Sequence, residues 1–333
     1  MEVAKVEVTA PCRLHFGLLS FGDPSVRQFG GVGVMIDCPA VQVRIEASPR
    51  FVVGEQFGPR LEALANRWAA GRSLSELPAC RLEVLSAPRL HIGLGVGTQL
   101  GLSVAWALDS FCGLPPLPVG QWTARMGRGL RSAVGTYGFF QGGLIAELGK
   151  LPHETLSPLD RRIALPSSWR FVLICPRQGE GLCGPAEGDA FARLPPVAED
   201  TARQLRGELQ ERLIPAAAGG DFEAFGESVY RFGHRAGLCY APLQGGAYNG
   251  ERLSELVDLI RRCGVAGVGQ SSWGPTVFAV CREADQAEKL VAELTRRAAI
   301  ADSEVWISAT NNRGAERCVW TQDGSVSRGS PAG

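Results

Sequence analysis

The stretch HIGLGVGTQ, residues 91–99, is the most informative feature of the chain, because three alternating glycines stand directly before an apolar segment (100–112) with a helical pattern. Glycine adopts backbone conformations that other residues avoid, and it lets a ligand approach the main chain closely. The first amides of a helix lack an acceptor within the helix, and the helix dipole places partial positive charge there. The stretch therefore predicts a phosphate or pyrophosphate site, while a tight turn that needs glycine only for packing is the other interpretation.

A second glycine-rich stretch, GVAGVGQSSWGPT at residues 264–276, precedes another strand-like segment. Within it, Gln270, Ser271 and Ser272 are polar and Trp273 is aromatic, which is unusual for a core strand. This combination is typical of a pocket that holds an aromatic ligand by hydrogen bonds at one edge and by contact with a ring face. Two glycine loops in one chain indicate an anion site built from both halves.

The composition predicts a globular protein with room for two domains. The chain has 333 residues, of which 45% are hydrophobic and 20% are charged. No apolar run approaches the roughly 20 residues that span a bilayer, and the first residues lack a signal-peptide pattern, so we expect a cytoplasmic protein without a membrane partner. The formal net charge of zero argues against a nucleic-acid partner. The ten cysteines form no C-x-x-C pair, so we expect reduced thiols and no zinc site.

Hydrophobic periodicity predicts an α+β protein with two halves. In the first half we expect strands at 3–10, 13–19, 34–37, 41–47, 81–85, 143–147 and 162–165, and helices at 60–70, 100–112 and 119–130. In the second half we expect strands at 170–175, 265–268, 276–280 and 305–308, and helices at 199–214, 221–236, 252–263 and 285–299. Loops are expected at 51–57 and 181–196.

A break at Pro166-Ser167-Ser168 suggests a boundary between the two halves. We therefore expect one domain at 1–166, which carries the first glycine loop, and a second at 167–322. The tail at 323–333 is rich in serine and glycine and is expected to be disordered.

The order of these segments resembles the GHMP kinase superfamily. Its three motifs are matched by APCRLH at 10–15, by the loop at 93–99 and by the loop at 264–276. The resemblance implies an N-terminal domain like domain 2 of ribosomal protein S5, a ferredoxin-like C-terminal domain, and a ligand between them.

Two departures from the kinase pattern argue against phosphoryl transfer. Kinases of this superfamily usually read G-L-G-S-S where this chain reads GLGVG (93–97), so the serines that serve nucleotide and magnesium are absent. Where some of them carry a catalytic Asp in S-G-x-D, this chain reads SAVG (132–135). Two functions remain as alternatives to a non-kinase enzyme with this fold. One is an ATP-dependent small-molecule kinase, and the other is a non-catalytic protein that binds a phosphorylated ligand.

The residues found in place of the kinase motifs resemble those of another family with this fold, β-ribofuranosylaminobenzene 5′-phosphate synthase. The matching stretches are RLHFGL (13–18), GGVG (30–33), GLGVGTQL (93–100), RGLRSAVGT (128–136) and GQSSWGPT (269–276). The resemblance implies a decarboxylating phosphoribosyltransferase, which joins phosphoribosyl pyrophosphate to 4-aminobenzoate or 4-hydroxybenzoate and releases pyrophosphate and carbon dioxide. It further implies a homodimer and a place in tetrahydromethanopterin biosynthesis, which serves one-carbon metabolism.

This reaction needs no covalent protein nucleophile, so positioning and charge stabilisation must accelerate it. We expect pyrophosphate to be held by Gly93, Gly95, Gly97, Thr98 and Gln99, through backbone amides and the threonine hydroxyl.

Magnesium is expected to bridge the phosphate oxygens, bound mainly by substrate and water. Asp23 and Asp37 are the candidate protein contacts to magnesium or the ribose, but a turn residue and a strand-end cap are the favoured interpretations of the two.

Four basic side chains are expected to face the same ligand. Arg13 and His15 alternate on one face of a strand, within reach of the benzoate carboxylate or the ribose. Arg128 and Arg131 lie three residues apart and would share a helix face from which they grip phosphate. The residues expected to act in catalysis are Arg13, His15, Gln270 and Ser271, and those expected to bind the aromatic substrate are Ser272 and Trp273.

Overall fold

The computed structural model describes residues 3–181 and 184–331. In the first half of the chain its elements are β1 (Val3–Ser20), β2 (Phe29–Ala47), β3 (Val52–Val53), α1 (Gly58–Gly71), β4 (Cys80–Ser86), α2 (Val96–Phe111), α3 (Val119–Arg125), α4 (Val134–Gln141), β5 (Leu144–Glu147) and β6 (Leu159–Ile163). In the second half they are β7 (Arg170–Pro176), α5 (Gly184–Arg193), α6 (Glu199–Glu208), a π-helical turn (Leu209–Leu213), α7 (Ile214–Gly219), α8 (Phe222–Leu238), α9 (Ala241–Gln244), α10 (Glu251–Arg262), β8 (Val268–Gln270), β9 (Val277–Cys281), α11 (Ala284–Arg296), β10 (Ser303–Ala309), β11 (Glu316–Thr321) and β12 (Val326–Gly329). Within the described ranges, no helix is long and apolar enough to cross a bilayer.

Two long antiparallel strands, β1 and β2, form the centre of the first sheet. The strands expected on either side of Pro11 are one strand, which pairs with β2 from Lys5 to Ser20 and is bulged at Pro11/Cys12 and His15/Gly17. Bulges bend a strand and redirect its side chains, which here include His15. The sheet order is β12-β11-β1-β2-β4-β3, with β5 paired to β2 and β6 to β5.

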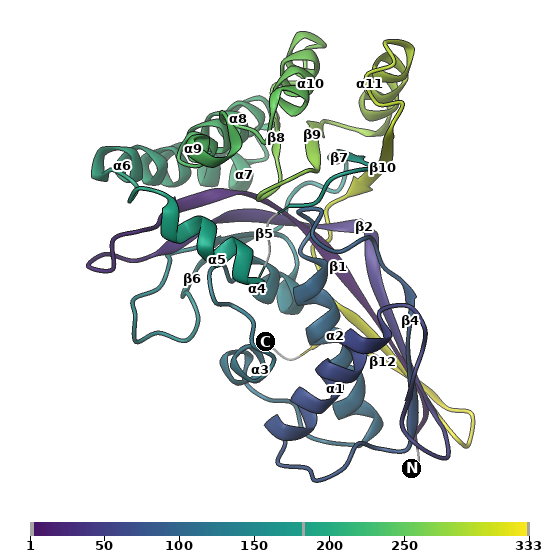
Figure 1. Cartoon of the computed structure of the whole chain (residues 1–333). Coiled ribbons are helices and arrows are strands. Elements are labelled where there is room, and N and C mark those ends of the chain that lie inside the picture. Colours follow the sequence, from purple (N-terminus) through teal and green to yellow (C-terminus); the bar gives the residue numbers. More distant parts are fainter. Residues whose placement is uncertain (1–2, 182–183, 332–333) are drawn as a thin grey trace.

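Helices from both halves pack around these strands (Figure 1). Helices α2 and α4 contact β1 and β2, and α1 packs on α2. The second sheet has the order β10-β7-β9-β8, with α10 against β8 and β9, and α11 against β7, β9 and β10. Helix α8 contacts both β1 and β8, so it joins the two sheets.

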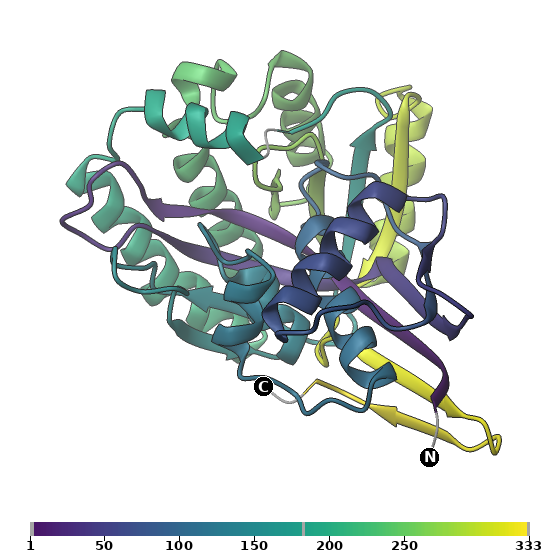
Figure 2. The same ribbon diagram turned by 60° about the horizontal axis from the view of Figure 1, so that its bottom comes forward.

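The C-terminal tail is ordered, so the prediction of disorder is wrong for residues 323–331; residues 332–333 lie outside the described residues. Strands β11 and β12 form a hairpin, and β11 pairs with β1 from Val3↔Thr321 to Thr9↔Glu316 (Figure 2). The exposed edge of β1 offers unpaired backbone groups, and this hairpin satisfies them. Residues 316–329 therefore complete the first sheet, and the expected second domain at 167–322 ends too late.

Two segments beside the glycine loop also differ from expectation. Residues expected to form a loop at 181–196 contain α5, whose Ala190 is buried in an aromatic cluster that collects residues from distant parts of the chain. The expected helix at 119–130 ends at Arg125, because Gly127 and Gly129 adopt φ values of 63° and 71°. Arg128 and Arg131 therefore lie on an irregular segment rather than on one helix face.

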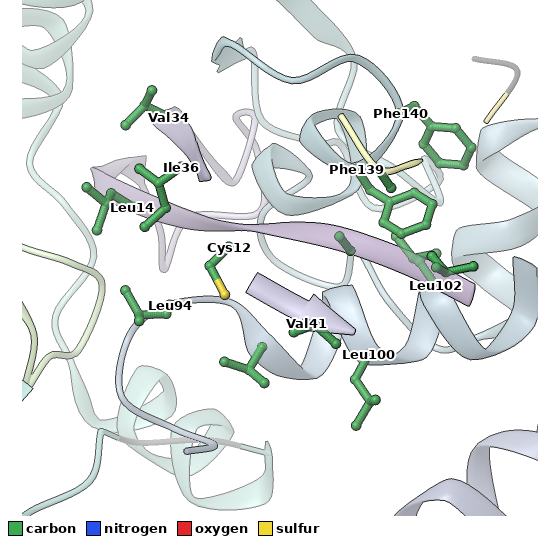
Figure 3. Close-up of a cluster of buried hydrophobic side chains, with 14 of the residues drawn as sticks. Cys12, Leu14, Val34, Ile36, Val41, Leu94, Leu100, Leu102, Phe139 and Phe140 are labelled. Atoms are coloured by element: carbon green, nitrogen blue, oxygen red, sulfur yellow. The ribbon is translucent and has the colours of Figure 1, made fainter. Parts of the chain in front are cut away.

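The apolar residues of the glycine loop anchor it in the core between β1 and α2. Ile92 and Leu94 are completely buried, as are Cys12 and Leu14 of β1 and Leu100 of α2. Figure 3 shows the Leu94 side chain among these residues. Burial of a leucine or isoleucine side chain contributes about 1.5–3 kcal/mol, so the loop is held rigidly while its glycines remain on the opposite side.

Candidate functional site

A pocket of about 510 Å³ lies between the two halves, lined by β1, the glycine loop, residues 127–132, α5, α8 and the second glycine loop. Most of the expected site residues line it: Arg13, His15, Gly93, Gly95, Gly97, Thr98, Arg128, Arg131, Gln270, Ser272 and Trp273. The tertiary structure thus brings together residues separated by more than 250 positions in the sequence.

Close approaches favour glycine at Gly93 and Gly95, and Gly97 faces the end of a flexible side chain. A Cβ atom at Gly93 would lie 2.4 Å from the carbonyl oxygen of Ser271, and one at Gly95 would lie 2.8 Å from Cγ of Arg13. Both residues also have positive φ, 84° and 71°. Gly97 lies in the first turn of α2, where a Cβ atom would be 2.9 Å from Nη2 of Arg60.

Arg60 and Arg128 line the pocket at this end of α2, and a third arginine near Arg128, Arg67, is exposed and donates to the Met126 carbonyl. Arg60 and Arg67 come from α1 and Arg128 from the irregular segment, and burial lowers the pKa of Arg128 to about 10, with the charges of the other two adding to the effect. The Nε atoms of Arg60 and Arg128 are buried without a hydrogen-bond partner in the described part of the chain. No carboxylate there forms an ion pair with any of the three.

In the empty protein such a cluster is unfavourable, because buried guanidinium groups lose their hydration and repel one another. A bound anion makes it favourable, because charge-assisted hydrogen bonds to the anion replace that hydration. Arg60 and Arg67 were not expected from the sequence. Their spacing of seven places them on one face of a helix, but arginines at that spacing are common on solvent-exposed faces.

Arg131 differs from Arg128 because it already has an acidic partner. It forms an ion pair with Glu187 of α5, and Glu187 also accepts a hydrogen bond of 3.1 Å from Nε1 of Trp273. The Arg131 guanidinium lies 5.6 Å from the ring centroid of Phe191. These contacts join three separate segments across the pocket and leave Arg131 less available to a phosphate than we expected.

An aromatic wall forms the opposite side of the pocket. Trp273 is 7% exposed, and its ring centroid lies 4.6 Å from that of Tyr240 and 5.6 Å from that of Phe191. Gln270 also lines the pocket, but its side-chain oxygen accepts from the Asn249 amide at 2.7 Å and its Nε2 donates to the Ser272 carbonyl. The wall suits a flat ring, and Gln270 acts mainly to hold the loop.

His15 lines the pocket and is only 3% exposed. Burial, with the charge of Arg13 beside it, lowers its pKa to about 3, so the imidazole is neutral near pH 7. Its Nε2 lies 3.0 Å from Oγ of Ser132, and that hydroxyl donates at 2.6 Å to the carboxylate of Glu147. Glu147 is 1% exposed, and burial raises its pKa.

Two expected site residues lie behind the pocket wall. Gln99 is buried, and its Nε2 donates to the Gly135 carbonyl at 2.8 Å, which ties α2 to α4. The Ser271 hydroxyl donates to the Gly93 carbonyl at 2.7 Å and accepts from the His15 amide. Ser271 therefore joins the two glycine loops and positions His15 without lining the cavity.

The two metal candidates are not brought to the pocket. Asp23 accepts hydrogen bonds from the amide and hydroxyl of Ser25 in a turn. Asp37 lies near the middle of β2, where it accepts from Nδ2 of Asn311. Among the described residues, no group of three or more His, Cys, Asp or Glu side chains is arranged to hold a metal ion.

Comparisons with known proteins agree with this geometry. A family model described as GHMP kinases C terminal matches residues 213–300. The homoserine kinase of Cytophaga hutchinsonii is similar in structure, with a TM-score of 0.70 and 18% identity over 94% of this chain and 97% of that one. The mevalonate diphosphate decarboxylase of Staphylococcus aureus has a TM-score of 0.64 and 11% identity over 95% and 98%. These likenesses show the fold.

The sequence relatives are more specific. A β-ribofuranosylphenol 5′-phosphate synthase of Archaeoglobus fulgidus is 30% identical over 83% of this chain and 87% of its own length. One of Methanothermobacter thermautotrophicus is 28% identical over 84% of this chain and 90% of its own length. The resemblance drawn from the glycine loops is therefore confirmed: this chain, with the fold of the GHMP kinases, belongs to the β-ribofuranosylphenol 5′-phosphate synthase family.

Proposed function

We propose that this protein joins phosphoribosyl pyrophosphate to 4-hydroxybenzoate or 4-aminobenzoate, with release of pyrophosphate and carbon dioxide. The observation that carries the proposal is the arginine cluster of Arg60 and Arg128, which line the pocket at the start of α2 without an acidic partner among the described residues. Together with the amides of the glycine loop, it provides a cradle for a strongly charged leaving group.

Each of the two substrates occupies the part of the pocket whose side chains suit its chemistry. The pyrophosphate lies at the glycine loop and the arginine cluster, and the aromatic acid lies toward Trp273 and the other rings of the aromatic wall. Arg13, whose pKa is lowered to about 10 mainly by burial, stands between the two regions within reach of a carboxylate or the ribose. The name of the relatives contains a phenol, which favours 4-hydroxybenzoate as the acceptor.

The chemistry requires stabilisation of charge rather than a nucleophilic side chain. Departure of pyrophosphate leaves an oxocarbenium-like centre at C1 of the ribose, and the ring carbon that bears the carboxylate attacks it. Loss of carbon dioxide then restores the aromatic ring. The arginine cluster acts on the leaving group, where negative charge increases most in the transition state.

Magnesium is part of this proposal as a companion of the pyrophosphate. Glu187 is the one carboxylate among the described lining residues, and it is paired with Arg131, so the pocket fits an ion held mainly by phosphate oxygens and water. When bound, the ion neutralises part of the charge of the departing pyrophosphate. We further propose a cytoplasmic homodimer that serves tetrahydromethanopterin biosynthesis.

The test is a reaction of the purified protein with phosphoribosyl pyrophosphate, Mg²⁺ and carboxyl-labelled 4-hydroxybenzoate or 4-aminobenzoate. We expect labelled carbon dioxide and pyrophosphate in equal amounts, and only when both substrates are present. Absence of both products, or pyrophosphate release that does not depend on the aromatic acid, would contradict the proposal. A parallel incubation with ATP and alcohol acceptors tests the kinase alternative.

A further inference from the structure

A buried chain of hydrogen bonds leads from the pocket to a carboxylate that the proposed reaction has not used. Ser132 has one hydroxyl hydrogen, and its Oγ lies 2.6 Å from Oε1 of Glu147. The Ala133 amide also donates to both oxygens of Glu147, at 2.9 and 2.8 Å, so this side chain is surrounded by donors as a carboxylate requires.

These donors determine which nitrogen of His15 carries the hydrogen. Because Ser132 donates to Glu147, it accepts from its other neighbour, the Nε2 atom of His15 at 3.0 Å. The Nδ1 atom then carries a lone pair, and it forms no hydrogen bond in the described part of the chain, although His15 lines the pocket. The imidazole is thus in the form that accepts a proton.

The ring of His15 is also held in place. The His15 amide donates to the Ser271 hydroxyl at 3.0 Å, and a Cβ atom at Gly31 would lie 3.3 Å from Cε1 of His15. The glycine at position 31 therefore lets β2 pack directly behind the ring. A histidine with a defined tautomer and orientation is a candidate proton acceptor.

We infer that His15 takes the proton of the para hydroxyl or amino group of the aromatic acid during carbon–carbon bond formation and returns it afterwards, while Ser132 and Glu147 position His15 and stabilise its charge. This inference rests on the proposed function.

The proposed step balances without another reactant. As the ring carbon bonds to C1 and the bond from C1 to pyrophosphate breaks, the O–H or N–H electrons enter the ring and the proton moves to Nδ1 of His15. When the bond to the carboxylate breaks, its electrons restore the aromatic ring, and the imidazolium returns the proton to the oxygen or nitrogen. No net proton is gained or lost by the protein.

The surrounding charges are consistent with a neutral base that becomes stronger in the complex. Burial is the main cause of the lowered pKa of His15, and Arg13 on β1 adds to it, while Arg13, Lys150 and Tyr137 are ionisable groups that interact with Glu147. Entry of a carboxylate and a pyrophosphate offsets the charge of Arg13. Glu147 supplies the opposite charge through Ser132.

The deciding variant is Ser132→Ala, compared with Ser132→Thr, which keeps the hydroxyl. For Ser132→Ala we expect kcat to fall about 100-fold, as for loss of a general base, with little change in the KM for phosphoribosyl pyrophosphate. Ser132→Thr should recover most of the turnover. Calorimetric titration with inorganic pyrophosphate checks that the fold and the anion site remain intact.

Two further readouts separate proton transfer from a purely structural role. The kcat of Ser132→Ala should rise with pH as the phenol of 4-hydroxybenzoate ionises, more steeply than the wild-type kcat. Its deficit relative to wild type should be smaller with 3-fluoro-4-hydroxybenzoate, whose phenol is more acidic. A deficit that is equal for both acids and at every pH, or no deficit, overturns the inference.

A measurement without substrate distinguishes failure of this inference from failure of the proposed function. The ¹⁵N chemical shifts of the His15 ring, assigned with His15→Gln, should show hydrogen on Nε2 in the wild type and a mixture of tautomers in Ser132→Ala. A wild-type protein that is inactive with both acids refutes the proposed function, whatever the shifts. An active protein with hydrogen on Nδ1 refutes this inference alone.

Discussion

Replacement of Arg128 by methionine should make the empty protein more stable and the anion site weaker. Lowering the pKa of this guanidinium from its usual value to about 10 makes its charged form about 3 kcal/mol less stable in the folded protein than in water. Both pKa values lie far above 7, so this cost is fully present at neutral pH and diminishes only as the pH rises toward 10. Methionine keeps an apolar chain beside α2, where Nε of Arg128 lies 3.2 Å from a Cβ position at Gly101.

Solvent in the open pocket offsets part of this cost, so we expect the free energy of unfolding to rise by about 1 kcal/mol and the Tm by a few degrees. Loss of a charge-assisted contact worth about 1.5–3 kcal/mol should weaken pyrophosphate binding about 10- to 100-fold. Denaturant titration and calorimetry measure the two quantities. Arg252→Met, at an exposed position of α10, is the matched control and should change neither. A destabilised Arg128→Met that binds pyrophosphate normally would refute the reasoning.

Four other predictions concern the same pocket. Gly97→Val should abolish turnover by displacing Arg60, while the Tm stays within a few degrees of the wild-type value. The control is Gly120→Val, where a Cβ atom meets nothing within 4 Å, and this variant should retain activity. Equal activity of the two variants would contradict the assignment of the loop to the anion site. Arg131→Ala and Glu187→Ala should each lower kcat/KM, and the double variant should have a kcat/KM only slightly below that of either single variant, because the two residues form one ion pair. Additive losses of kcat/KM in the double-mutant cycle would argue against that pairing. His15 alone should lower the free energy of unfolding by about 2 kcal/mol between pH 7 and pH 5. The reason is that the unfolded histidine takes up a proton near pH 6.5, whereas the folded one does so only near pH 3. In denaturant titrations, His15→Gln should lack this pH-dependent loss of stability. ATP should bind more weakly than phosphoribosyl pyrophosphate in calorimetry, and formation of a phosphorylated alcohol would favour a kinase instead.

Features that depend on local pattern follow from the sequence alone. The glycines at 93, 95 and 97, the strand with Arg13 and His15, and the polar and aromatic residues at 270–273 predicted an anion and aromatic pocket, because glycine spacing and strand alternation are local properties. The same stretches carried the resemblance to the family that the relatives confirm. Boundaries were less accurate where a glycine with positive φ ended a helix, as at Gly127.

Which charged groups and hydrogen-bonding groups come into contact depends on the packing of the folded chain. Arg60 has an ordinary place in a helix, and it is the packing of α1 on α2 that makes it part of an anion site. Glu187 lies in a segment without a strong pattern, yet it neutralises Arg131. The buried chain of hydrogen bonds from His15 through Ser132 to Glu147 joins residues 132 positions apart in the sequence. Electrostatic energies and hydrogen bonds depend on distance and burial in space, and neither is a function of spacing along the chain.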